Sequence, residues 1–140
     1  MNKLVANDQQ ILFTDSWQEK MNNEFSQSGN DMTFEDIAKL SATINFASLL
    51  AYWEAVGRQT RKIISTMDVG QFKMKVDHSS IKRLFDENAV LLESQWLAEF
   101  LSKKTIAGLI LMPATRHNFL HLNICIRVKE KLQKQKMKLK

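Results

Sequence analysis

The chain has 140 residues, of which 44% are hydrophobic and 25% charged, and its net charge is +5 at neutral pH. Four glycines and one proline offer few of the turns that a multi-stranded sheet needs, so the composition favours helices over strands. The only cysteine, Cys125, excludes an internal disulfide and a cysteine-rich zinc module. The length is typical of one domain, and we expect residues 1–140 to form a single all-α unit.

The apolar segments are short. No secretory signal pattern follows Met1, and the longest apolar stretch, TIAGLILMPA at residues 105–114, is about half of what a bilayer-spanning helix needs. These features predict a cytoplasmic protein without a membrane partner.

The positive charge is confined to the C-terminal end. Residues 127–140 hold seven basic residues and one acidic residue, whereas the other 126 residues hold thirteen basic and fourteen acidic residues. Basic residues complement the dipole at a helix C-terminus, and this stretch has no aromatic residue for stacking on bases. We interpret the tail, from about residue 133, as a solvated helix end and expect no nucleic-acid partner; the alternative is a phosphate or membrane-surface contact.

The first half of the chain predicts two helical regions. Residues 3–24 place apolar side chains on one helical face, with an interruption near Asp15 and Ser16. After a polar loop, TFED at residues 33–36 is a capping box that opens a long helical run to about Met67, with a restart near Ser41.

The second half predicts two more helical regions. Residues 80–102 show a helical pattern that breaks near Asn88, and residues 104–136 form the last helix, with Pro113 as a kink or as the first turn of a new helix. Four such regions with short connections predict an antiparallel four-helix bundle. The expected core includes one tryptophan from each of three helices and a stripe on the last one, namely Trp17, Trp53, Trp96, Leu120, Ile124, Val128 and Leu132.

The stretch MPATRHNFLHLN carries the main functional signal. His117 and His121 are one helical turn apart, about 6 Å along the axis, so both imidazoles can converge on one metal ion. The alternative is that both histidines merely line a polar flank beside the core stripe. Cys125 lies another turn away, too far to share that ion, and is predicted to be a buried apolar thiol. His78 is predicted to be an exposed loop residue.

Two stretches carry a resemblance to a known family. The segment TIAGLILMPATRHNFLHLNICIRVKEKL resembles the last helix of the DinB-like superfamily of four-helix bundles, and LSATINFASLLAYWEAVGRQTRKII resembles its long earlier helix. The resemblance implies that His117 and His121 are two of three metal-binding histidines. The family's third histidine lies upstream, where this chain has none before His78. Asp8 or Asn7, His78, and an empty position are the alternatives for the third ligand.

The resemblance also implies a function. Some family members are thiol-dependent transferases or isomerases that work with a divalent metal and a low-molecular-weight thiol; here we expect zinc or nickel as the metal and a small-molecule thiol or electrophile as the partner. The alternative is a non-catalytic bundle that has lost a complete site and serves as a dimerising or binding module. In either case we expect a homodimer, because a shortened first helix would leave an apolar flank uncovered.

Overall fold

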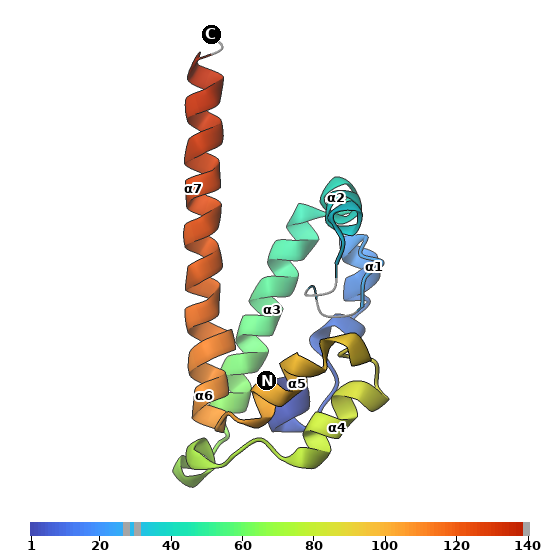
Figure 1. The fold of residues 1–140 in the computed structure, drawn as a ribbon, viewed down its shortest axis with the longest axis vertical. Coiled ribbons are helices and arrows are strands. Elements are labelled where there is room, and N and C mark those ends of the chain that lie inside the picture. Colours follow the sequence, from blue (N-terminus) through green and yellow to red (C-terminus); the bar gives the residue numbers. More distant parts are fainter. Residues whose placement is uncertain (27–28, 30–31, 139–140) are drawn as a thin grey trace.

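The structure is a computed structural model, which describes residues 1–26, 29 and 32–138. The predicted all-α class is confirmed: 76% of the chain is helical, and the described part contains no strand. Figure 1 shows two long helices, α3 and α7; α1 and α2 lie near the upper end of α3, α4 and α5 lie beside the N-terminal turns, and α6 lies at the base of α7. The α-helices are α1 (Trp17–Met21), α2 (Phe34–Thr43), α3 (Phe46–Ser65), α4 (His78–Asp86), α5 (Gln95–Ser102), α6 (Ile106–Leu111) and α7 (His117–Lys138).

The first helical region is broken rather than continuous. A π-helical turn, η1 (Asn2–Ala6), and a 3₁₀ turn, η2 (Ile11–Phe13), precede the short helix α1. The breaks fall at polar residues with left-handed backbone, at φ 56° for Asn7, 51° for Asp15, 55° for Ser16 and 59° for Asn22. Asn and Asp adopt this conformation more readily than most residues. The predicted interruption at residues 15–16 is therefore confirmed, and the single long helix around it is wrong.

The predicted capping box at the start of α2 is present. The Thr33 hydroxyl accepts from the Asp36 N–H at 3.1 Å, and an Asp36 carboxylate oxygen accepts from the Thr33 N–H at 2.9 Å. The chain restarts slightly later than predicted, because the Asn45 side chain accepts from the Ser48 N–H at 3.0 Å and caps α3. Two side-chain caps thus divide what the sequence pattern suggested as one long run.

The capping box should make the start of α2 sensitive to acid. Hydrogen bonds from the Thr33 backbone and hydroxyl hold the pKa of the Asp36 carboxyl below its ordinary value of 3.8. A lowered carboxyl pKa adds stability above the unfolded pKa, and this stability is lost as pH falls through the folded pKa. We expect an NMR titration of the Asp36 carboxyl carbon to have its midpoint below 3.8 and Thr33→Ala to raise it. Equal midpoints in both proteins would contradict this account.

The predicted break near Asn88 separates α4 from α5. Asn88 has a left-handed backbone at φ 50°, and the Ala89 N–H donates to the Leu84 carbonyl at 2.8 Å, which closes α4. Leu84, Ala89 and Val90 then form a buried cluster. Around it pack Leu4 from η1, Ile81 and Phe85 from α4, and Leu97 and Leu101 from α5. The core of the molecule therefore lies between the N-terminal turn and the α4–α5 pair.

Two backbone hydrogen bonds connect the start of α6 to the segment before α4. The Val76 N–H donates to the Lys104 carbonyl at 3.3 Å, and the Ile106 N–H donates to the Met74 carbonyl at 2.9 Å. The Thr105 hydroxyl caps α6 by accepting from the Gly108 N–H at 3.1 Å. Leu109, only 2% exposed, anchors this helix. The base of the C-terminal helices is thus fixed to the body.

The last helical region continues past Pro113 through a π-helical turn, η6 (Met112–Arg116), into α7. The proline lies in the first turn of this π segment, which agrees with one of the two predicted placements. The His117 N–H donates to the Met112 carbonyl, five residues earlier, and the Thr115 hydroxyl donates to the Leu111 carbonyl at 2.8 Å. His117 and His121 therefore lie on one helix, as predicted.

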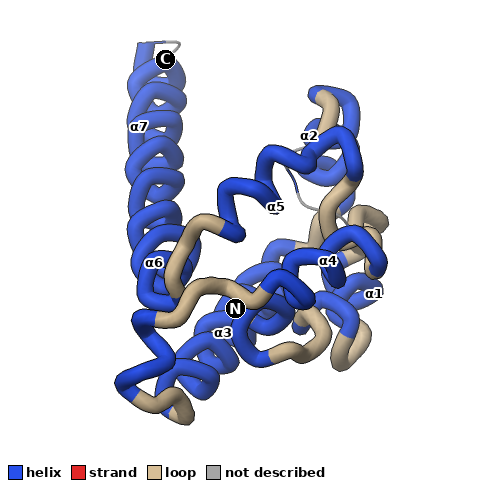
Figure 2. Tube along the Cα trace, turned by 60° about the horizontal axis from the view of Figure 1, so that its bottom comes forward, coloured by secondary structure: helices blue, strands red, loops and turns tan. Residues whose placement is uncertain are grey.

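Helix α7 extends away from the rest of the molecule (Figures 1 and 2). Its main neighbour is η6, and all of its residues are exposed, Cys125 included. The predictions of a buried core stripe on this helix and of a buried Cys125 are wrong for the isolated chain, because no second helix covers them. Trp53 and Trp96, 56% and 57% exposed, are likewise not core residues.

None of the helices in the described ranges combines the length and the apolar character that crossing a membrane requires.

Candidate functional site

The histidine pair has a defined geometry on α7. The Nε2 atoms of His117 and His121 lie 2.8 Å apart, the ring centroids are 4.4 Å apart, and the ring planes meet at 81°. The positions follow from the helix, which puts residues four apart on one face, and from side chains that lean along the axis toward each other. The two Nε2 atoms are therefore in direct hydrogen-bond contact on one face of α7.

The histidine pair suits a divalent metal ion. Two nitrogen ligands of a tetrahedral zinc ion, each about 2.0–2.1 Å from it, are about 3.3 Å apart, so the hydrogen-bonded Nε2 atoms, 2.8 Å apart, have to separate by about 0.5 Å to bind one ion. Imidazole is a preferred ligand of zinc and nickel. Without the ion, one ring donates a hydrogen bond through Nε2 and the other accepts it. The two side chains fit a metal at two of its coordination positions.

The third ligand is not supplied by this chain in the described fold. Within residues 1–26, 29 and 32–138, no group of three His, Cys, Asp or Glu side chains has an arrangement that would hold a metal. Asp8 accepts from the Gln9 N–H at 2.7 Å, and Asn7 contacts Arg83, both in the N-terminal turn. His78 is exposed, as predicted. It lies at the start of helix α4 and not in the predicted loop.

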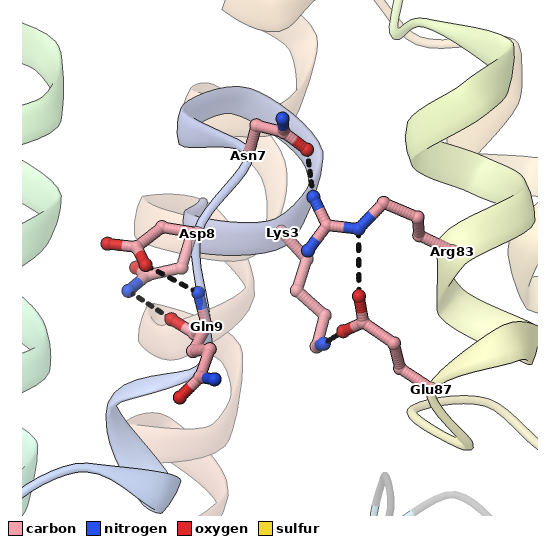
Figure 3. Close-up of polar contacts among 7 residues, drawn as sticks. Lys3, Asn7, Asp8, Gln9, Arg83 and Glu87 are labelled. Atoms are coloured by element: carbon pink, nitrogen blue, oxygen red, sulfur yellow. Dashed lines mark hydrogen bonds and ion pairs between the residues drawn. The ribbon is translucent and has the colours of Figure 1, made fainter.

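A second polar cluster joins the N-terminal turn to α4 (Figure 3). The Lys3 ammonium, 8% exposed as a side chain, forms an ion pair with the Glu87 carboxylate. Arg83 donates through Nε to the other Glu87 oxygen at 2.8 Å and through a terminal nitrogen to the Asn7 side-chain oxygen. Burial and the nearby Arg83 charge lower the pKa of Lys3. This network fixes the first turn of the chain against α4.

A cavity of about 270 Å³ lies beside this cluster, with Lys3, Tyr52 and Leu84 among its lining residues. Tyr52 also meets the edge of the Trp17 ring at a centroid distance of 5.7 Å, and burial raises the pKa of its phenol. The Lys3 amine is already paired with Glu87, so the cavity has no free positive charge from this lysine to bind an anion.

Sequence patterns located the histidine pair but not the Lys3–Glu87 network. Lys3 stands next to Leu4 and Val5 and is separated from Glu87 by 84 residues, so no local spacing links the two charges. The available signal was a lysine inside an apolar stretch, which requires a partner if it is buried.

Comparison with known proteins adds no relative to this description: neither protein-family models, nor curated proteins, nor solved structures give a match to the chain.

Proposed function

We propose that this chain is a DinB-like protein that binds a divalent metal ion, zinc or nickel, through His117 and His121. The observation that carries the proposal is that the Nε2 atoms of His117 and His121 meet on one face of α7, 2.8 Å apart, so that a small side-chain movement brings them to the separation of about 3.3 Å of two ligands on a tetrahedral ion. In this proposal the four helical regions, 2–21, 34–65, 78–102 and 106–138, correspond in chain order to the four helices of the family's antiparallel bundle, although all of α7 is exposed in the single chain. The α7 pair is then the family's C-terminal ligand pair.

The activity that we propose is transfer of a small-molecule thiol to an electrophile. A bound divalent ion would act as a Lewis acid that lowers the pKa of a thiol or water in an open position. The protein's part is to place both imidazoles on one face of α7 with their Nε2 atoms close together. The ring that donates through Nε2 in the 2.8 Å contact has to carry its proton on Nδ1 instead, which frees both Nε2 lone pairs for the ion.

Metal content and affinity test this proposal directly. We expect the purified protein to retain zinc or nickel. His117→Ala or His121→Ala should each weaken metal binding by at least about 10–100-fold, because loss of a group that only supports a metal ligand already costs that much. His78→Ala is the matched control, because His78 is also an exposed helical histidine but has no imidazole neighbour. Equally low metal content in the wild type and both α7 variants would refute the metal-site proposal.

A second candidate function rests on the uncovered apolar side chains of the long helices. Phe46, Leu50 and Trp53 of α3 are 56–72% exposed, and α7 exposes a further set of apolar residues. Surfaces of this kind commonly mark interfaces. A non-catalytic module that dimerises through them is the alternative. Light scattering at tens of micromolar should then give the mass of a homodimer, and metal removal should leave that mass unchanged.

A further inference from the structure

Helix α7 carries an uncovered row of apolar side chains. Figures 1 and 2 show that its C-terminal end extends past the other helices. Four apolar side chains one turn apart are 47–57% exposed, and we call them the α7 stripe: Leu120, Ile124, Val128 and Leu132. Uncovered apolar residues of this kind are typical of a contact surface. The charges beside the C-terminal half of the stripe indicate which partner fits it.

The residues around Val128 and Leu132 follow the seven-residue repeat of a coiled-coil helix. In this repeat, written a to g, positions a and d contact the second helix, and positions e and g flank that contact. With Leu132 at position a, the preceding a position is Cys125. The d positions are then Val128 and Gln135, and all four of these side chains are exposed. We call them the α7 seam.

Every position that flanks the α7 seam within residues 125–138 is a lysine. The e positions are Lys129 and Lys136, and the g positions are Lys131 and Lys138. Among the described residues, each ion pair lies outside α7, so these ammonium groups face solvent without a counter-charge. A helix with carboxylates beside its own seam would pair with the lysines and cover the apolar residues between them at the same time.

A second copy of α7 does not fit this seam. In a parallel pair, the g position of one helix faces the following e position of the other, so Lys131 would meet the partner's Lys136. In an antiparallel pair, e faces e and g faces g, which again brings lysines together. Like charges at such positions destabilise the pair and select against it. Charge therefore selects a helix other than α7 itself, with Glu or Asp at its e and g positions.

Two other negatively charged partners fit the segment less well. A helix that lies on an anionic membrane gathers its apolar residues on one face. Here Ile126 and Met137, 54% and 70% exposed, lie on the side of α7 away from the seam, at 100° per residue. A nucleic acid would bring phosphates against the apolar seam, and residues 125–138 have no aromatic side chain for stacking on bases. A narrow apolar seam between two rows of charge is instead the pattern of a helix pair.

We propose that residues 125–138 of α7 bind an acidic amphipathic helix of another protein as a two-stranded coiled coil. Apolar a and d residues of that helix cover Val128 and Leu132, and its Glu or Asp residues pair with the four flanking lysines. The contact spans two heptads, about 21 Å of helix, so it is small and the complex is transient. The histidine pair lies before this segment, and the inference does not depend on metal binding.

Two synthetic peptides test the selection by charge. Both have Ile at a and Leu at d over about four heptads, and they differ only at e and g, which are Glu in one and Lys in the other. The Glu peptide should bind the full-length protein at least about tenfold more tightly, and about 0.5 M salt should weaken this binding by screening. Equal affinities, or no binding of either peptide, would overturn the proposal. So would tighter binding of a peptide of residues 117–138, of vesicles with equal parts phosphatidylserine and phosphatidylcholine, or of duplex DNA.

Two double variants with the same change in net charge test the heptad assignment. Lys129→Glu with Lys136→Glu reverses both e positions beside the seam. Arg127→Glu with Lys134→Glu reverses both c positions, which face away from it. The e variant should weaken binding of the Glu peptide about tenfold, and the c variant by less than about threefold, because only the e positions adjoin the partner helix. Equal losses would show attraction of anions without a seam and refute the coiled coil. Circular dichroism checks that both variants keep their helix content.

Discussion

Replacing Leu109 by alanine should lower the free energy of unfolding by about 2–5 kcal/mol, the range for a buried leucine that leaves a cavity. Leu109 is 2% exposed and lies in α6, the helix that fixes the base of α7 to the body. Loss of its side chain removes apolar contacts at this joint, and the surrounding helices relax only in part. Urea unfolding followed by circular dichroism measures the change.

The matched control is Leu111→Ala in the same helix. Leu111 is 49% exposed, so the same chemical change removes fewer buried contacts and should cost about 0.5 kcal/mol or less. A difference between the two variants below about 1 kcal/mol would mean that α6 does not anchor the C-terminal region as the structure describes.

Removing the charge of Glu87 should be the second large effect. Glu87→Gln leaves the buried Lys3 ammonium without its counter-charge and weakens the contact to Arg83. Breaking a fully buried pair costs about 3–5 kcal/mol, but the Glu87 side chain is 36% exposed, and solvent screens part of this; we expect about 1–3 kcal/mol. Urea unfolding at neutral pH measures it. Lys3→Met with Glu87→Leu should recover most of the loss, because it leaves no buried charge unpaired; the Arg83 side chain is 29% exposed and keeps its contact to Asn7.

The Glu54–Arg58 pair on α3 is the control for Glu87. Its shortest N–O distance is 3.6 Å and both side chains are more than half exposed, so Glu54→Gln should change the free energy of unfolding by only a few tenths of a kcal/mol. The Glu87→Gln deficit should also shrink at high pH. The folded pKa of Lys3 is already lowered in the wild type, and loss of the Glu87 charge should lower it further. Below 10.5 the variant therefore gains more stability with rising pH than the wild type does, because its folded Lys3 releases the proton earlier. A deficit that grows with pH would contradict this assignment.

Local features of the fold were predictable because their causes lie within a few residues. The Thr33–Asp36 capping box and the break at Asn88 depend on short-range hydrogen bonds and backbone preference, and both occur where the sequence placed them. Burial was less predictable, because it depends on which helix comes to cover an apolar face. The α7 stripe has a core-like pattern and is nevertheless exposed in the single chain.

For the candidate site, too, only the local part was predictable from the sequence. That His117 and His121 share one face follows from four-residue spacing alone, and the structure adds the 2.8 Å contact between the rings. The ligands that would complete the proposed metal site cannot be inferred from local spacing, since they would have to come from outside this face of α7. Lys3 and Glu87 illustrate the same limit, because the fold brings them together from positions 84 residues apart.

The π-helical turn η6 has a consequence for changes in chain length. It holds one residue more per turn than an α-helix, as the His117-to-Met112 hydrogen bond shows. Deleting one residue within 112–116 would convert this turn to regular α-helix and leave the histidines facing the same way. The same deletion between His121 and Ile124 would rotate everything beyond it by about 100° and carry Ile124 and Val128 out of line with the histidines. Homologous chains that differ by one residue in this region can therefore share the same surface when the difference lies in η6, and not when it lies in α7.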